Sequence, residues 1–295
     1  MPSEKFGANC AILMPFNADE SVDVARLVAH GKWVLENGVS SFTLFGTTGE
    51  GGSFGRRERA ELIHAVLKAG IPAKQLVSGI MASAWPDAAD MALDALDAGV
   101  RNVLVPPPYY FKNPTQDGVY NWYARFFDAL GSKARDVILY TIPSVTEVEL
   151  TIPLIKRLAA GFPEVVKGVK DSTGDWAFGQ ELIRERGKLF ILIGNETKLA
   201  EACRMGAEGS ISGIANLLPR TLTDHVEGKD VDVDAMAALV AAVCAHPVTP
   251  ALKVIAAHLK GDDAWLRVRA PFVPFAGPGA PELIAAFEKL FGGKV

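Results

Sequence analysis

The sequence predicts a closed (β/α)₈ TIM barrel followed by a helical C-terminal region. Over residues 1–227, eight short apolar segments alternate with eight helical patterns at a spacing of about 25 residues. This alternation is typical of a parallel sheet whose strands are linked by helices. An open, doubly wound sheet is the alternative. However, no Gly-x-Gly-x-x-Gly follows the first strand and no Gly-Lys-Ser/Thr loop occurs in the chain, so the nucleotide-binding forms of that sheet are disfavoured.

The expected strands are rich in β-branched and other apolar residues, as buried strands are. They cover residues 8–14, 40–45, 76–81, 102–105, 137–141, 165–170, 189–193 and 209–212. The helices between them carry apolar residues at helical spacing, and the first two end at Gly38 and Gly70. They are expected at residues 22–37, 56–69, 86–98, 116–130, 153–160, 176–186, 197–205 and 215–222.

The remaining segment, residues 228–295, contains helical patterns and no strand pattern. The helices are expected at residues 233–244, 250–259 and 281–291. The stretch 270–279 contains three prolines and two glycines, which predict a rigid extended linker. We expect this region to pack on the barrel or on a neighbouring subunit.

Composition excludes several classes of partner. The formal net charge is −4 and the lysines and arginines are scattered, so we expect no nucleic acid partner. The three cysteines are far apart in the chain, which argues against disulfides and structural zinc and favours a reducing compartment. No signal-peptide pattern opens the chain, and no apolar run approaches the roughly 18 residues of a membrane span. The expected protein is therefore soluble and cytoplasmic, without membrane contact.

Several polar side chains follow the expected strands at their C-terminal ends. In a (β/α)₈ barrel these ends and the loops after them form a single mouth, where reactive residues lie. The residues concerned are Thr47 and Thr48 after the second strand, Tyr109 and Tyr110 after the fourth, Tyr140 in the fifth and Lys170 in the sixth. The sequence therefore predicts that they meet at one site.

These side chains have complementary chemistry. An apolar barrel interior disfavours an ammonium ion, so it favours the neutral lysine amine that attacks a ketone. The phenol of Tyr140 is suited to moving a proton to and from the carbinolamine that becomes an imine. The tight loop that begins Gly46-Thr47-Thr48-Gly49 offers backbone N–H groups and hydroxyls that bind a carboxylate.

Each feature also has a purely structural interpretation. Lys170 alone is more often a solvated strand end or the ion-pair partner of Asp171. The glycine-rich loop is as often a simple turn, Glu50 is suited to bracing it, and Tyr140 alone is more often a core residue. The five histidines fall in helical patterns with no zinc-ligand spacing, so we expect no metal.

Taken together, three motifs resemble the signatures of the dihydrodipicolinate synthase / N-acetylneuraminate lyase family, which belongs to the class I Schiff-base aldolase superfamily. They are Gly46-Thr47-Thr48-Gly49-Glu50, Tyr140-x-x-Pro143 and Gly168-Val169-Lys170-Asp171. The segments Pro108-Tyr109-Tyr110, Gly194-Asn195-Glu196 and Ile211-Ser212-Gly213 stand where that family has similar segments. The resemblance covers essentially the whole chain.

The resemblance implies a lyase or aldolase that acts on pyruvate or another 2-oxo acid without a cofactor, through an imine on Lys170. Tyr140 would be the proton shuttle, and Thr48 would link it to Tyr110, or to Tyr109, of a neighbouring subunit in a homotetramer. Gly46, Thr47, Thr48 and Ile211 would contact the 2-oxo acid. Asn195 and Glu196 would bind hydroxyl groups of a sugar-acid chain, and the second substrate is expected to be an aldehyde.

Departures from the family pattern bear on that second substrate. The lysine-pathway synthase has an arginine two residues after the motif proline, where it binds a carboxylate, and this chain has Val145. An isopropyl group makes no such contact, which disfavours the true synthase. Thr47 and Gly213 stand where sialic acid lyases usually have serine. A deoxy-keto sugar acid aldolase and an enzyme for apolar or aromatic aldehydes remain open, as do a metal-bound enolate mechanism and a non-catalytic 2-oxo acid-binding relative.

Overall fold

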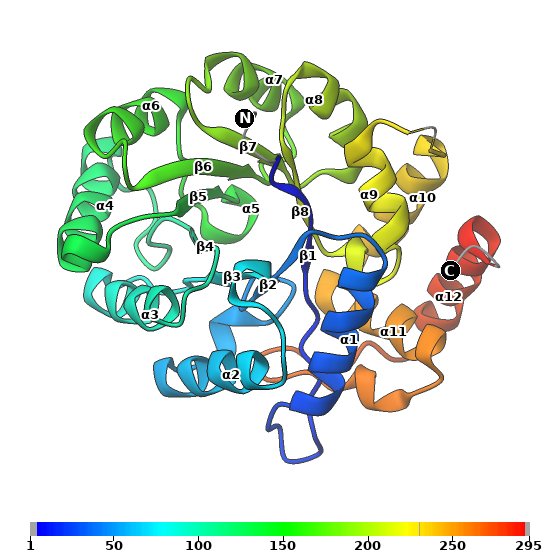
Figure 1. Ribbon diagram of the computed structural model, residues 1–295. Coiled ribbons are helices and arrows are strands. Elements are labelled where there is room, and N and C mark those ends of the chain that lie inside the picture. The colour runs from blue at the N-terminus through cyan, green and yellow to red at the C-terminus, as the bar shows by residue number, and fades with distance from the viewer. Residues whose placement is uncertain (1–4, 230, 293–295) are drawn as a thin grey trace.

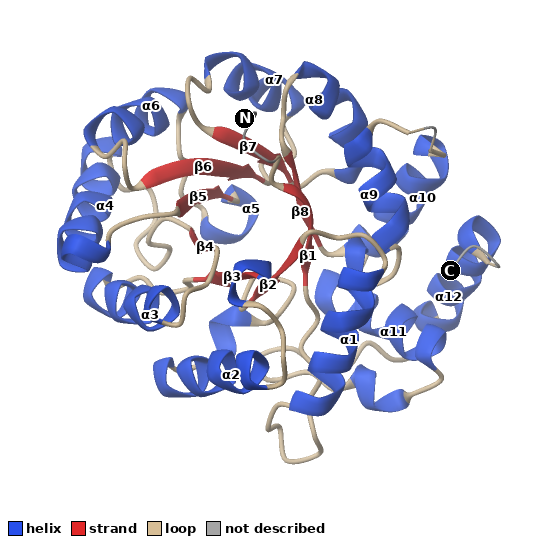
Figure 2. Ribbon diagram, viewed as in Figure 1, coloured by secondary structure: helices blue, strands red, loops and turns tan. Residues whose placement is uncertain are grey.

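Eight parallel strands form a closed barrel in the order of the chain, and β1 pairs with β8 to complete it. The structure is a computed structural model that describes residues 5–229 and 231–292. Figure 2 shows the ring of strands with helices outside it. The strands are β1 (Gly7–Ala11), β2 (Ser41–Leu44), β3 (Leu76–Gly79), β4 (Asn102–Val105), β5 (Val137–Thr141), β6 (Val166–Asp171), β7 (Phe190–Ile193) and β8 (Gly209–Ser212). The predicted fold class is confirmed.

A helix follows each strand and covers the barrel, as Figure 1 shows. These helices are α1 (Val24–Glu36), α2 (Arg56–Lys68), α3 (Trp85–Asp97), α4 (Gln116–Leu130), α6 (Ile152–Gly161), α7 (Trp176–Glu185), α8 (Leu199–Met205) and α9 (Pro219–Glu227). Side-chain caps define several of their starts. Thr115 accepts a hydrogen bond from Gly118 N, and Thr151 accepts one from Leu154 N. Gly206 and Gly228 end α8 and α9 in the left-handed conformation.

Short helical turns complete the connections. The 3₁₀ turns are η1 (Gly51–Ser53), η2 (Ala73–Gln75), η3 (Gly131–Lys133), η4 (Glu196–Lys198), η5 (Ile214–Asn216) and η6 (Asp263–Leu266), and a one-turn helix, α5 (Pro143–Thr146), follows β5. The turns η1, η4 and η5 and the helix α5 all lie in loops after strands. They therefore shape the mouth of the barrel.

The strands are buried on both sides, so they separate two hydrophobic layers. The outer layer lies between strands and helices and contains Val103, Val105 and Tyr123, whose hydroxyl donates to Val105 O at 3.0 Å. The inner layer fills the barrel and includes Leu104, Ile138 and Tyr140. The alternation of side chains along β5 places Tyr140 inside the barrel. A phenol in this apolar interior needs a polar partner.

The C-terminal region packs on the barrel through its own hydrophobic cluster. Helices α10 (Val233–Cys244), α11 (Val248–Lys260) and α12 (Gly279–Phe291) share a core with Leu13, Ile214 and Leu217. Figure 1 shows this region on one side of the barrel, next to α1 and α9. Within the described residues no single helix is long and apolar enough to span a membrane, and α10 with α11 meets the criterion only as a pair bent by 117°.

Two element boundaries differ from the prediction for a physical reason. The first strand ends at Ala11 rather than residue 14, because Leu13 N donates to the Asn216 side chain at 2.8 Å instead of to a strand. The apolar run continues because Leu13 is buried against the C-terminal helices. The helix expected at residues 215–222 is η5 followed by α9, which starts at Pro219, since proline favours the first turn of a helix.

Candidate active site

Lys170 and Tyr140 lie side by side on neighbouring strands inside the barrel mouth. They are register partners in the β5–β6 pair, and Lys170 Nζ donates to Tyr140 Oη at 3.3 Å. The same nitrogen lies 4.3 Å from the centre of the Tyr140 ring. Lys170 is 6% exposed, and among the ion pairs of the described residues it has no carboxylate partner. A buried lysine beside a phenol, without a carboxylate partner in the described residues, is a candidate functional residue.

Asp171 does not neutralise its neighbour. The alternation along β6 turns the two side chains to opposite sides of the strand, and Asp171 Oδ1 accepts hydrogen bonds from the Thr173 N–H at 2.9 Å and hydroxyl at 2.8 Å. Burial raises the pKa of the Asp171 carboxyl, and the bonds from Thr173 oppose that rise. The carboxylate shapes the loop after β6, so the ion-pair interpretation of Lys170 is wrong.

A hydroxyl from the loop after β2 continues the chain of hydrogen bonds. Thr47 Oγ1 lies 3.3 Å from Tyr140 Oη, so hydroxyl, phenol and amine form one line from Thr47 to Lys170. The resemblance implied that Thr48 links Tyr140 to a tyrosine of a neighbouring subunit, but the hydroxyl that reaches Tyr140 is that of Thr47. Consecutive residues of the turn point in different directions, and Thr48 instead lines the cavity while its carbonyl accepts from the Thr249 hydroxyl at 3.4 Å.

The loop that carries Thr47 is held in an unusual backbone conformation. Phe45 and Glu50 both have positive φ, at 58° and 56°, which costs of order 1–3 kcal/mol per residue. A side chain at Gly51 would meet the Phe45 carbonyl oxygen at 1.9 Å, so only glycine fits there. The buried Arg59 stabilises this arrangement. Its guanidinium lies 4.3 Å from the Phe45 ring centre and donates to Gly51 O at 2.8 Å.

Glu50 anchors the same loop to the C-terminal region. Lys253 Nζ lies 2.5 Å from Glu50 Oε1 and 2.5 Å from Arg267 O, and the other Glu50 oxygen accepts from Arg269 N at 2.8 Å. Burial lowers the pKa of Lys253 to about 8, and the Glu50 charge opposes that effect. Glu50 therefore braces the loop, which is the structural role that the sequence suggested for it.

A cavity of about 380 Å³ opens above Lys170. It brings together six of the residues expected at the site, namely Thr47, Thr48, Tyr140, Lys170, Glu196 and Ile211. A second cavity of about 320 Å³ shares the Thr47, Tyr140 and Val145 side and also touches Tyr109. A larger cavity of about 460 Å³ lies between α6 and α7, but no lysine lines it. The cavity at the barrel mouth is therefore the candidate active site.

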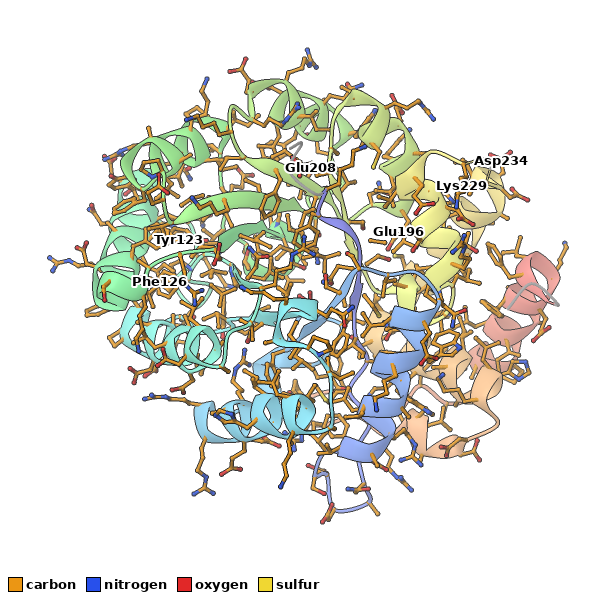
Figure 3. The ribbon with its side chains drawn as sticks, in the orientation of Figure 1. Tyr123, Phe126, Glu196, Glu208, Lys229 and Asp234 are labelled. Carbon is orange, nitrogen blue, oxygen red and sulfur yellow. The ribbon has the colours of Figure 1, made fainter. Side chains whose placement is uncertain are left out.

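Glu196 is the one carboxylate residue that lines this cavity in the described part of the chain. It is 7% exposed, and the Ser212 hydroxyl donates to it. Ser212 Oγ in turn accepts from Ile214 N at 3.0 Å, so its proton is directed to the carboxylate. Burial raises the pKa of Glu196, and the bond from Ser212 opposes the rise. In Figure 3, Glu196 lies on the side of the barrel that faces α9 and α10.

Three expected site residues do not line the cavity. Gly46 turns the loop, and its carbonyl accepts from Gly51 N at 3.0 Å. Asn195 caps η4, because its side-chain oxygen accepts from the N–H and the hydroxyl of Thr197. Tyr110 is 75% exposed and packs edge-on against Phe111, with ring centres 5.2 Å apart. Its neighbour Tyr109 is turned inward and donates to Met81 O at 3.2 Å.

The C-terminal region contributes side chains to the cavity that were not expected from the sequence. Val240, Val243 and Cys244 of α10, Leu252 of α11 and Phe272 of the linker all line the cavity. The sequence feature that could have indicated this contribution is Pro271-Phe272, because an aromatic residue in a stiff proline-rich linker is held away from the neighbouring helices. Within residues 5–229 and 231–292, no three His, Cys, Asp or Glu residues gather in a way that could hold a metal ion.

The chain is similar to known proteins along nearly its whole length. The model of the Dihydrodipicolinate synthetase family matches residues 5–288. An uncharacterized DapA-like lyase from Chloroflexus aurantiacus is 32% identical over an alignment of 301 positions, which covers 99% of each chain. A 4-hydroxy-tetrahydrodipicolinate synthase from a Psychrobacter species is 31% identical over 74% of this chain and 70% of that protein.

Solved structures agree with these matches. A crystal structure of dihydrodipicolinate synthase from Agrobacterium tumefaciens aligns with a TM-score of 0.95 and 44% identity, over 97% of this chain and 100% of that one. The Escherichia coli prophage protein YagE, crystallised with pyruvate, aligns with a TM-score of 0.85 at 20% identity, which supports the fold.

Proposed function

The chain belongs to the dihydrodipicolinate synthetase family of lyases, and from that premise we propose that it forms an imine between Lys170 and pyruvate or a related 2-oxo acid. The observation that carries the proposal is the line of contacts from Lys170 Nζ through Tyr140 Oη to Thr47 Oγ1, with 3.3 Å at each step. It joins a nucleophile, a proton carrier and a hydroxyl inside one buried cavity.

The reaction begins with attack of the neutral Lys170 amine on the ketone carbon. Tyr140 passes a proton to the carbinolamine oxygen, water leaves, and an imine remains. Loss of a proton from the methyl carbon gives an enamine, which forms a carbon–carbon bond to the carbonyl carbon of an aldehyde, and the aldehyde oxygen takes up a proton. Water then hydrolyses the imine, so pyruvate and the aldehyde together yield a 4-hydroxy-2-oxo acid. Cleavage follows the same steps in reverse, and no cofactor takes part.

The carboxylate of the 2-oxo acid is assigned to the loop after β2. Thr47 and Thr48 both line the cavity, and each carries a hydroxyl. Ile211 closes the base of the site from β8. Hydroxyl donors suit this role because they bind the anion without adding a fixed positive charge, which would oppose protonation of the imine nitrogen.

Glu196 is assigned to the oxygen of the second substrate. It lines the cavity, and the hydrogen bond that it accepts from Ser212 fixes its orientation. A carboxyl group whose pKa is raised by burial is suited to exchange a proton with the new hydroxyl group. Asn195 acts through η4, which it caps, rather than by direct contact.

Tyr110 is assigned to the active site of a neighbouring subunit in a homotetramer. The support is the resemblance together with its position, since Tyr110 and Phe111 are both more than 70% exposed on the loop after β4. The Tyr109 hydroxyl donates to Met81 O within its own subunit, so Tyr110 is the better candidate for a contact with the neighbouring active site.

The true synthase reaction is the alternative, because several relatives carry that name. It requires a cation for the carboxylate of the incoming aldehyde. Val145 stands at that position and is 56% exposed, and its isopropyl group offers no cation to a carboxylate. A non-catalytic relative would bind the 2-oxo acid without exchanging its methyl protons.

Trapping of the imine tests the proposal. Borohydride added with pyruvate should leave a covalent mass on Lys170, located by peptide mapping. Lys170→Ala should show none. Lys167→Ala is the matched control, because Lys167 lies on the same strand with its Nζ bonded to Pro163 O, outside the barrel mouth. An intact mass unchanged by every 2-oxo acid tried would exclude the imine.

A further inference from the structure

The wall that the C-terminal region adds to the cavity above Lys170 is mainly apolar, with one hydroxyl, that of Thr249. Its apolar residues include Val240 and Val243 of α10 and Leu252 of α11, and Val145 and Phe272 border the opening. Val145 is 56% exposed although it is an aliphatic residue beside the reactive group. Apolar side chains at the rim of a cavity are typical of a binding surface for an apolar ligand.

Charge is scarce around this wall. Lys170 and Glu196 are the two charged side chains that line the cavity in the described part of the chain. In the proposed reaction the Lys170 nitrogen forms the imine with the 2-oxo acid. Its ammonium group is therefore not available to pair with the carboxylate of a second substrate. Glu196 accepts from Ser212 and forms no ion pair among those found in residues 5–229 and 231–292. A second carboxylate would therefore meet an acid rather than a cation.

The adjoining cavity has the same character. It is lined by Met81, Pro106 and Phe272, and its one charged lining residue is Glu50. Both Glu50 oxygens are already bonded, one to Lys253 Nζ and the other to Arg269 N. The two cavities meet at Tyr140 and Val145, and in the described residues Lys170 is the one cationic side chain that lines either of them.

We infer that the second substrate is an aldehyde with an uncharged, apolar body, aliphatic or aromatic, that lies between Val145 and the α10–α11 wall. This inference rests on the proposed imine chemistry and adds the class of the partner. The specificity-determining residues are Val145, Val240 and Leu252, which contact the body of the aldehyde. The aldehyde oxygen lies toward Glu196.

Matched pairs of aldehydes test the inference. Benzaldehyde is compared with 4-carboxybenzaldehyde, and pentanal with succinic semialdehyde, by pyruvate consumption and by mass spectrometry of the 4-hydroxy-2-oxo acid. Every rate is divided by the fraction of chain that borohydride traps with pyruvate. We expect kcat/KM at least tenfold higher for the uncharged member of each pair. A carboxylate preference in both pairs would overturn the inference.

A positive charge introduced at Val145 should reverse the preference between the uncharged and the carboxylate-bearing aldehyde. Val145→Arg is expected to raise kcat/KM for 4-carboxybenzaldehyde relative to benzaldehyde by tenfold or more, because a guanidinium pairs with a carboxylate. Val145→Leu controls for size, and its ratio should stay on the side of benzaldehyde. An unchanged ratio in Val145→Arg would also overturn the inference. Failure of imine formation itself appears separately, as the absence of the trapped pyruvate adduct.

Discussion

Lys253 and Glu50, which are 203 residues apart in the chain, form a fully buried ion pair with 2.5 Å between Nζ and Oε1. Lys253 belongs to α11 and Glu50 to the loop that carries Thr47. The pair therefore connects the C-terminal region to the strained loop at the barrel mouth. A buried pair of this kind is costly to break, because removal of one partner leaves a buried charge without compensation.

Loss of the Lys253 ammonium should therefore destabilise the protein. Lys253→Met is expected to lower the free energy of unfolding by about 3–5 kcal/mol, measured by chemical denaturation. The double variant Lys253→Met with Glu50→Gln removes both charges and should recover part of that loss. Lys229→Met, which removes a half-exposed lysine paired with Asp224, should change stability by about 1 kcal/mol at most. Equal effects of Lys253→Met and Lys229→Met would contradict the expected role.

Removal of the Tyr140 hydroxyl should slow the chemistry more than binding. Tyr140→Phe keeps the ring beside Lys170 but deletes the oxygen that contacts both Lys170 and Thr47. We expect kcat to fall by roughly 10²–10⁴-fold with a smaller change in KM, measured by steady-state kinetics. Tyr123→Phe is the control, since its hydroxyl bonds Val105 O outside the barrel. Tyr123 is labelled in Figure 3 on α4. That variant should lose about 1 kcal/mol of stability and keep its activity.

The two threonines should differ in effect. Thr47→Val removes the hydroxyl that contacts Tyr140 and is expected to lower kcat by tenfold or more. Thr48→Val keeps that contact and should act mainly on KM for the 2-oxo acid, since Thr48 lines the cavity without touching Tyr140. Both substitutions preserve side-chain shape, so each is a control for the other. If Thr48→Val gave the larger loss of kcat, the assignment of the link to Thr47 would be wrong.

The stability of the fold should fall in acid because of His30. Its imidazole is buried, Nε2 lies 3.0 Å from Asn216 Oδ1, and Nδ1 has no partner in the described structure. Burial lowers the pKa of His30 to about 3, with Lys260 adding to the effect. The unfolded chain binds this proton near pH 6.5, so the contribution is complete above pH 6.5 and is lost as the pH falls toward 3.

The expected slope is about 1.4 kcal/mol of unfolding free energy per pH unit within that window. Denaturation of the wild-type chain and of His30→Gln at several pH values measures it, because glutamine keeps a donor toward Asn216 and does not titrate. His64→Gln, which removes an exposed histidine, should follow the wild type. Parallel curves for the wild type and His30→Gln would show that His30 does not cause the loss.

The barrel could be predicted because its signals are local. Each apolar strand and the amphipathic helix after it lie within a window of about 25 residues. Each such strand–helix unit buries its apolar face against the next unit. The placement of Lys170 and Tyr140 at one mouth follows from the barrel rule and needs no knowledge of distant contacts. Their side-by-side position at 3.3 Å is then a matter of register between β5 and β6.

What the sequence by itself determined is the fold class, the residues of the mouth and the family to which they point. Tertiary structure decided which threonine reaches Tyr140, because the turn conformation set by Phe45 and Glu50 orients Thr47. It also decided that α10, α11 and Phe272 complete the cavity. These contacts join residues about 100 to 200 positions apart, and no local pattern encodes them, since they arise only when the C-terminal helices bury Leu13 and Ile214 against the barrel.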